Sequence, residues 1–141
     1  MINVRAGLLR GGAVAISIAL AACAGVRSPP PHETLGTARQ AGNQQHPRGI
    51  GDYLPHAVCV NEAIERLAAP VARYPDLVRL QEDARVSLSD KIDAKEISVR
   101  SGERRMRRVD TLIAQASHDR DTGNDGSADH RIATIDRIMR E

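Results

Sequence analysis

Acidic side chains recur at intervals of four in a polar, turn-rich segment late in the chain. Residues 118–126 read HDRDTGNDG, and Asp121, Asp125 and Asp129 fall at every fourth position in and just after them. Hard cations such as Ca²⁺ prefer several oxygen ligands from a tightly turned backbone, so these aspartates are the candidates for a calcium site. His118 and His130 frame the segment and would suit zinc only if two further ligands joined them.

The segment resembles an EF-hand calcium loop but departs from it at two positions. Counted from Asp121, Gly123 stands third, where a ligand is needed, and Ile132 stands twelfth, where a bidentate glutamate is needed. The alternative interpretation, a solvated loop between two helices, is the one that the sequence favours. We therefore predict neither a metal site nor a cofactor.

A second charged segment contains five arginines between residues 100 and 108. Arg100, Arg104 and Arg107 share one side of a helix, and guanidinium groups recognise phosphates and carboxylates, so these three are candidate anion-binding residues. Their ligand would be lipid phosphate, envelope polysaccharide or an acidic protein patch. The favoured alternative is a solvated face balanced by acids of the preceding helix. No aromatic residue interleaves with the arginines, which argues against nucleic acid as a partner.

Patterns typical of enzyme active sites do not occur in this sequence. It has no Gly-x-Ser-x-Gly, no His-Glu-x-x-His, no phosphate-binding glycine loop and no dinucleotide fingerprint. The formal net charge is +2, and loss of Arg5 and Arg10 with a leader would leave equal numbers of basic and acidic side chains. A global field that gathers nucleic acid is therefore not expected, and we predict that the protein is not an enzyme.

Helices must position these residues, because apolar residues repeat at helical spacing from residue 54 onward. The first helix is expected from just after Pro55 to about Arg73, with Pro70 kinking it or ending it early. Tyr74-Pro75-Asp76 signals the start of a second helix, since proline suits a first helical turn. The apolar stripe of that helix consists of Leu77, Leu80, Ala84, Leu88 and Ile92.

A third helix is expected from Ser98 or Ser101 to about Ser117, after a break at residues 94–97. Short connections favour antiparallel neighbours, which indicates a helical hairpin. A last helix, capped by Ser127, should follow the 118–126 loop. The sequence thus predicts an all-α fold: a small domain of three to four helices over residues 54–141, built on an antiparallel hairpin. With neither Phe nor Trp, its core should be marginal, which favours burial by a partner or by self-association.

Residues 1–22 have the layout of a secretory signal peptide. Arg5 and Arg10 precede an apolar run over residues 11–22 that is too short to span a bilayer comfortably. The run ends in Leu20-Ala21-Ala22-Cys23, which resembles the lipobox of bacterial lipoproteins. The resemblance implies cleavage before Cys23 and lipidation of that residue. Ala24, rather than Asp, follows it, which implies outer-membrane sorting in a host with two membranes and the domain in the periplasm.

Residues 23–53 are rich in Pro and Gly and poor in apolar residues. Such a segment buries too little surface to offset its ordering entropy, so it is predicted to be a flexible tether between the lipid and the domain. Cys59 remains beside Val58 and Val60 and is expected to act as a small buried hydrophobe, with a disulfide-linked dimer as the alternative.

Together these features predict a lipid-anchored cell-envelope protein that serves as a structural or protein-interaction module facing the periplasm. The lipid on Cys23 would anchor the protein to the membrane. The partner would be an envelope protein or a second copy of this chain. Two alternatives stay open. One is a small binding protein for an anionic ligand or metal, and the other is an enzyme or enzyme inhibitor with an unrecognised site.

Overall fold

The computed structural model describes residues 34–141, and these residues contain helices but no strands. In chain order the elements are α1 (Leu35–Gln45), α2 (Tyr53–Leu67), the short 3-10 helix η1 (Ala69–Val71), α3 (Pro75–Asp93), α4 (Val99–Asp121) and α5 (Asp125–Arg140). The all-α fold is confirmed. The predicted signal peptide, Cys23 and the tether up to residue 33 lie outside the described residues.

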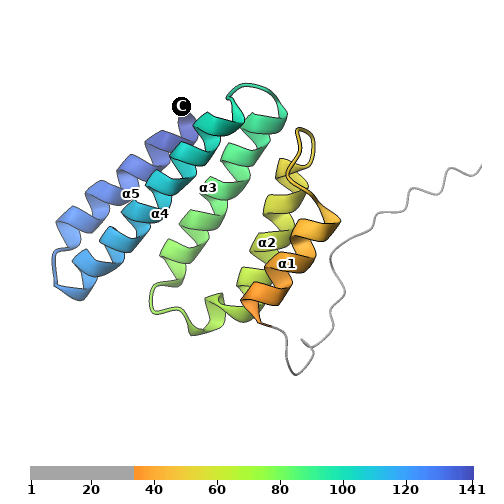
Figure 1. The fold of residues 1–141 in the computed structure, drawn as a ribbon. Helices are drawn as coiled ribbons and strands as arrows, with labels where there is room; N and C mark the ends of the chain where they lie inside the picture. Colours follow the sequence, from red (N-terminus) through yellow and green to blue (C-terminus); the bar gives the residue numbers. More distant parts are fainter. Residues whose placement is uncertain (1–33) are drawn as a thin grey trace, which may run out of the picture.

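Helix α3 stands at the centre, with the α1–α2 pair on one side of it and the α4–α5 pair on the other (Figure 1). Helices α3, α4 and α5 all contact one another. Among the described helices, α1 contacts only α2, and α2 contacts α3 but neither α4 nor α5. The fold is therefore a three-helix bundle with a two-helix unit attached to α3.

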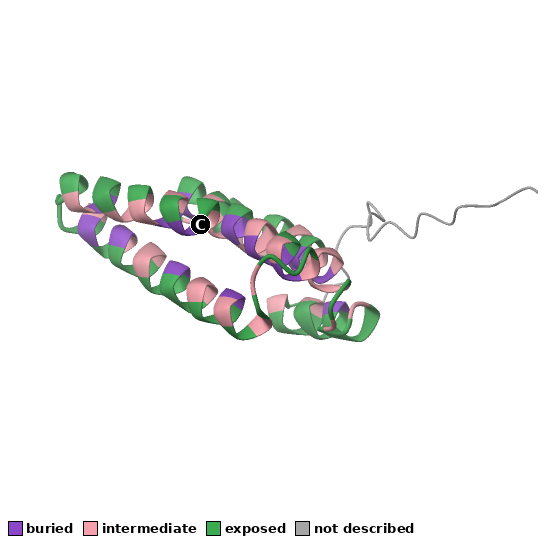
Figure 2. Ribbon diagram, turned by 90° about the horizontal axis from the view of Figure 1, so that it is seen from above, coloured by how far each residue is buried: buried purple, intermediate pink, exposed green. Residues whose placement is uncertain are grey.

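The core of the bundle is built from small and aliphatic side chains. Buried residues recur along the inner sides of the long helices, while exposed residues cover their outer sides (Figure 2). Two clusters join α3, α4 and α5, one of Ala84, Val109, Ile135 and Ile138 and the other of Leu77, Ala116 and Ala128. The alanines let the helices approach closely, which partly compensates for the missing aromatic rings.

Helices α3 and α4 form the predicted antiparallel hairpin (Figure 1). The connection turns at Lys95, whose φ of 61° is left-handed. Ser98 then caps the start of α4, because its hydroxyl accepts the Ser101 amide at 3.2 Å. Near this turn, Gly102 lies against Ile92: a Cβ at Gly102 would come within 2.5 Å of the Ile92 Cδ1. The absence of a side chain at residue 102 therefore sets how closely α4 approaches α3.

Helix α2 begins at Tyr53, slightly before the predicted start, and ends at Leu67. Pro70 follows within η1, so the expectation that this proline ends the helix early is confirmed. The reason is steric and chemical, because proline lacks an amide hydrogen and its ring clashes with the preceding turn.

The prediction of a flexible tether over residues 23–53 is wrong for its described part. Residues 35–45 form α1, which packs against α2 with Gly42 beside the Cys59 side chain. Thr34 and Thr37 cap its start through reciprocal hydrogen bonds of 3.2 and 2.9 Å. Helix α1 buries little more than Gly42, so it needs no apolar stripe and its sequence has none. Hydrophobic periodicity therefore could not reveal this helix. Cys59 is half-buried rather than buried.

Asp93, at the end of α3, fastens the start of α2 to the rest of the fold. Its carboxylate accepts the backbone amides of Gly51, Tyr53 and Leu54 at 2.7, 3.3 and 2.8 Å. Burial opposes its ionisation, but these three donors outweigh that effect and lower the pKa of Asp93. One side chain thus supplies the N-terminal cap that Asp52 does not provide.

The predicted loop at residues 118–126 is mostly helical, which corrects two expectations. Helix α4 continues to Asp121, and α5 starts at Asp125, so only residues 122–124 connect them. Ser127 lies inside α5 and Asn124 precedes the helix, so Ser127 is not its cap. Gly123, with φ of 73°, allows the tight reversal after α4. The predicted domain holds four α-helices, α2 to α5, which confirms the expected three to four, and α1 precedes it as a fifth helix in the described residues.

Replacement of Gly102 by valine should destabilise the α3–α4 hairpin. The new side chain would overlap the Ile92 Cγ1 and Cδ1, which lie 2.9 and 2.5 Å from the added Cβ. We expect the free energy of unfolding to fall by about 2 kcal/mol, the usual cost of overpacking, in urea titrations followed by circular dichroism.

Gly126→Ala is the matched control, because Gly126 also lies in a helix but has no atom within 4 Å of an added Cβ. This variant should be as stable as the parent or more stable by up to about 1 kcal/mol. Equal stability of Gly102→Val and the parent would contradict the close contact between α3 and α4.

Candidate functional site

An open cleft runs along α3 because α2 contacts α3 without reaching α4. It has a volume of about 490 Å³, within the range of roughly 300–1,000 Å³ usual for small-ligand sites. Helices α1 and α2 form one wall, α3 the floor and α4 the other wall. This cleft is the candidate functional site, and sequence analysis did not predict it.

The α1–α2 wall carries basic and aromatic side chains. Arg39 from α1, Arg48 from the connection, and Tyr53 and His56 from α2 all line the cleft. The His56 Nδ1 donates to the His46 carbonyl oxygen at 3.0 Å, which fixes the ring. Burial lowers the pKa of His56, so its imidazole favours the neutral form.

The floor of the cleft contains Arg85, a half-buried guanidinium. Its Nη1 donates to the side-chain oxygen of Asn61 on α2, and Asn61 donates in turn to the Glu82 carbonyl oxygen at 3.1 Å. Burial lowers the pKa of Arg85; the neighbouring Arg39 acts in the same direction, whereas Asp110 and Glu82 oppose it. Because arginine keeps its proton in proteins, Arg85 remains a cation, and its side-chain hydrogen-bond partner is the neutral Asn61 amide.

The α4 wall has the opposite charge. Glu103 and Asp110 line it on either side of Met106, and the Asp110 Oδ1 accepts the Gln81 amide at 2.7 Å. The cleft therefore presents cations on α1 and α3 to carboxylates on α4, with an apolar strip between them. Such a site can orient a ligand by charge.

The cleft does not contain an evident nucleophile–base pair. Ser89 and His56 both line it, but among the described residues no hydrogen bond joins them. Hydroxyl activation needs a base within hydrogen-bond reach of the oxygen.

The predicted anion-binding residues Arg100, Arg104 and Arg107 are exposed on α4, outside the cleft. Within residues 34–141, no ion pair joins any of them to an acid of α3 or of another helix. The exposure of the three arginines fits the expected solvated face, although no direct ion pair with an α3 acid balances it within these residues. Two of the α3 acids have other partners: Asp76 pairs with Arg120 at 2.7 Å, and Asp93 binds backbone amides.

The predicted calcium candidates Asp121, Asp125 and Asp129 do not form one site. Asp121 ends α4 and binds Arg73 at 2.8 Å and the Tyr74 hydroxyl at 2.7 Å. Asp125 and Asp129 lie exposed on the first turns of α5. In the described part of the chain, no three His, Cys, Asp or Glu side chains are grouped to hold a metal ion. The continued helix removes the turned backbone that a calcium loop requires.

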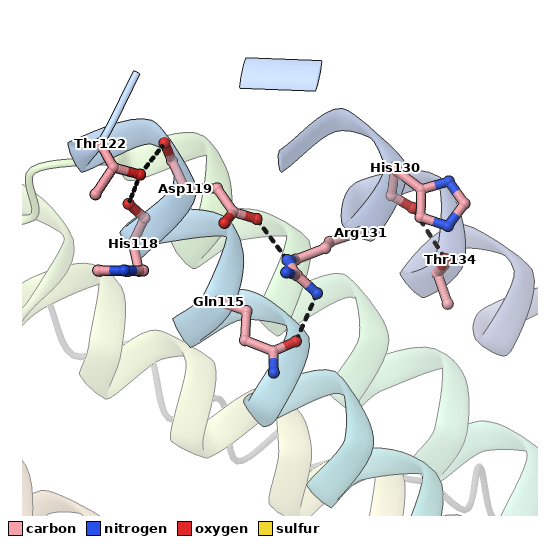
Figure 3. A network of polar contacts seen from close by, with 7 residues as sticks. All are labelled: Gln115, His118, Asp119, Thr122, His130, Arg131 and Thr134. Carbon is pink, nitrogen blue, oxygen red and sulfur yellow. Dashed lines mark hydrogen bonds and ion pairs between the residues drawn. The ribbon is translucent and has the colours of Figure 1, made fainter. Parts of the chain in front are cut away.

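The side chain of Asp119, near the end of α4, joins α4 to α5. Figure 3 shows its carboxylate facing Arg131, which also reaches Gln115; the distances are 2.5 and 2.8 Å. His118 and His130 lie on opposite sides of this pair and do not converge (Figure 3). Asp119 is only 8% exposed, so its pair with Arg131 is structural. No local sequence pattern predicted this pair, because Arg131 lies across the turn in α5.

Glu82 is a buried carboxyl group between α2 and α3. Burial, followed by the hydrogen bond and negative charge of Glu65 on α2, raises the pKa of Glu82 to about 7. One oxygen of Glu82 and one of Glu62 are buried with no hydrogen-bond partner in the described structure. The contact between α2 and α3 therefore contains a carboxyl group that resists ionisation.

No protein-family model, curated protein or solved structure matches this chain. The functional argument therefore depends on the residues themselves. None of the helices in residues 34–141 combines the length and apolar character needed to cross a bilayer.

Sequence reasoning missed Arg39, Arg48 and Arg85. Arg85 gave a faint signal, because it falls beside the apolar stripe of α3 and its guanidinium could be drawn inward. Arg39 and Arg48 gave none, since they lie in the segment interpreted as a tether. Only the packing of α1 on α2 brings them to the cleft.

Replacement of Glu82 by glutamine should flatten the pH dependence of stability. The pKa of Glu82 is about 7 in the folded protein, above its ordinary value of 4.5. The stabilisation linked to this proton is therefore complete below pH 4.5 and declines as the pH rises towards 7. The variant should lose less stability over this window, by on the order of 2 kcal/mol, in urea titrations at several pH values.

Glu96→Gln is the control, because it removes an equal charge from an exposed residue between α3 and α4. Its pH profile should match that of the parent. If Glu82→Gln also matched the parent, Glu82 would ionise normally in the folded protein.

Proposed function

We propose that this chain is a lipid-anchored cell-envelope protein whose helical domain is a non-enzymatic interaction module. The anchor would be a lipid on Cys23, as the Leu20-Ala21-Ala22-Cys23 motif suggests. Ala24 favours the outer membrane, with the domain in the periplasm. Acyl chains bind membranes by about 0.8 kcal/mol per buried methylene, so a multiply acylated cysteine is a durable tether.

The observation that carries the interaction role is the exposed arginine face of α4, formed by Arg100, Arg104 and Arg107. Its charges have no ion-pair partner in the described residues. Several exposed like charges on one helix face mildly destabilise a lone helix. An acidic protein patch would relieve that repulsion, and arginine forms bidentate contacts with carboxylates. The partner would be an envelope protein or a second copy of this chain.

A second candidate function is the binding of a small anionic ligand. The cleft favours it, because Arg39, Arg48 and Arg85 line a cavity of about 490 Å³. This role is compatible with the same anchor and uses different arginines. An unrecognised enzyme or enzyme inhibitor is less well supported, because the cleft offers no paired nucleophile and base.

Cys23→Ala should abolish lipidation. In cells labelled with radioactive palmitate, the parent chain should carry the label and the variant should not, because the motif gives the lipid no other acceptor. Immunoprecipitation and autoradiography would measure this.

Cys59→Ala is the matched control, since it removes the other cysteine and should leave labelling unchanged. Equal labelling of Cys23→Ala and the parent would contradict the anchor. This outcome would not affect the role proposed for the arginine face.

A photoreactive amino acid at Thr111 should capture the interaction partner in intact cells. Thr111 is exposed on α4, one turn beyond Arg107, and its hydroxyl bonds only the Arg107 carbonyl oxygen. We expect one discrete adduct by mass spectrometry, and at least a several-fold lower yield when Arg104 and Arg107 are both changed to glutamate, because electrostatic complementarity governs encounter.

The same probe at Ala133, exposed on α5, serves as the control and should give no such adduct. The interaction role would fail if Thr111 and Ala133 both yielded only uncrosslinked monomer. An adduct of twice the chain mass would identify the partner as a second copy.

A further inference from the structure

Two arginines from different helices, Arg39 and Arg85, line the cleft. Helix α1 runs antiparallel to α2, since Gly42 lies beside Cys59 and the His46 carbonyl meets the His56 ring. This register places Arg39, about one turn before Gly42, near the level of Asn61. Asn61 holds the Arg85 guanidinium, so Arg39 and Arg85 face the same part of the cleft.

Neither guanidinium has an acid bound to it. In residues 34–141, Arg39 forms no ion pair or side-chain hydrogen bond, and the side-chain partner of Arg85 is the neutral Asn61 amide. Arg39 is close enough to lower the pKa of Arg85, which means that the two cations repel each other. Asp110 stabilises the Arg85 cation more strongly than Arg39 destabilises it, and the Asp110 Oδ1 also accepts the Gln81 amide at 2.7 Å. An anion between the two arginines would be attracted by both guanidinium groups.

The cleft continues from these arginines over an apolar strip. Val60 from α2, Leu88 from α3 and Met106 from α4 line it, and Ile92 lies at the far end. Arg85 and Ile92 are seven residues apart on one helix, which corresponds to about 10 Å. The site thus combines a cationic end with an apolar channel roughly the length of a short alkyl chain.

We infer that the cleft binds a small amphiphilic monoanion, with its carboxylate or phosphate headgroup between Arg39 and Arg85 and its apolar part along Val60, Leu88 and Met106. The inference rests on the second candidate function above and names its ligand class. Guanidinium groups bind carboxylate and phosphate oxygens in bidentate fashion, and apolar walls take up the chain.

The size and charge of the cleft limit the ligand further. A helix about 10 Å in diameter would fill 490 Å³ in little more than one turn, so a partner helix is too large. Glu103 and Asp110 on the α4 wall add negative charge to the cleft, which disfavours a ligand with more than one anionic group. Arg48 and Glu103, which carry opposite charges, also line the cleft. The ligand therefore carries one anionic headgroup.

The test is calorimetric titration of the full chain, held in phosphatidylcholine nanodiscs, with hexanoate and hexyl phosphate. Hexanol and hexylammonium test the need for negative charge, and acetate tests the need for the apolar chain. Empty nanodiscs give the background. We expect the two anions to bind at least about tenfold more tightly than the three controls, as expected for hydrogen bonds to a charged group. The tighter of hexanoate and hexyl phosphate identifies the headgroup.

Variants then locate the site. Arg39→Gln should weaken binding about tenfold while leaving the fold intact, because Arg39 is exposed. Arg85→Met should abolish binding but also loses the Asn61 contact, so its circular dichroism spectrum is recorded alongside. Arg137→Gln removes an equal charge from an exposed position on α5 and should bind like the parent.

Two results would overturn the inference: anions binding no better than hexanol, or Arg39→Gln binding as tightly as Arg137→Gln. Capture of an acidic peptide by the cleft without any binding of the two anions would also overturn it. Failure here leaves the Thr111 crosslink unchanged, because that test depends on the arginines of α4. Loss of the crosslink with retained anion binding would have the opposite meaning.

Discussion

The carboxylate of Asp93 joins the two parts of this fold. It accepts three backbone amides at the start of α2, and so ties the α1–α2 unit to the end of α3. Because α2 has no side-chain cap of its own, these bonds also satisfy the donors of its first turn. The position of α2, and with it that of Arg39 and Arg48, depends on this contact. The cleft exists because α2 is held against α3 there and not against α4.

The two sides of α3 differ in the polarity of their contacts. Towards α4 and α5 the contacts are apolar, with Ala84 and Leu77 in closed clusters. Towards α2, polar groups lie among the apolar contacts: Arg85 binds Asn61 and Glu82 lies beside Glu65, while Val60 and Ile64 of α2 are buried. Buried polar groups cost free energy when they lack partners, and oxygens of Glu62 and Glu82 do lack them. The α2–α3 joint should therefore be the softer of the two and the more sensitive to pH and ligand.

Sequence reasoning succeeded where the apolar period was strong and failed where other contacts determined the structure. The stripe of α3 and the Ser98 cap of α4 were both readable, because each signal is local. The extension of α4 to Asp121 was missed, since Asp119 and Asp121 become favourable in a helix only when Arg131 and Arg73 arrive from other elements. Helix α1 was missed because a polar helix that buries one glycine leaves no apolar pattern.

The sequence by itself determined the helical class, the α3–α4 hairpin and the lipobox-like motif at Cys23, since each follows from neighbouring residues. Only the tertiary structure decided which charges meet. It left Arg100, Arg104 and Arg107 without acids, separated Asp121 from Asp125 and Asp129, and brought Arg39 to Arg85. The reason is geometric: spacing within one helix fixes which residues share a face, whereas the register between helices depends on contacts such as Asp93 to Leu54, made across 39 residues.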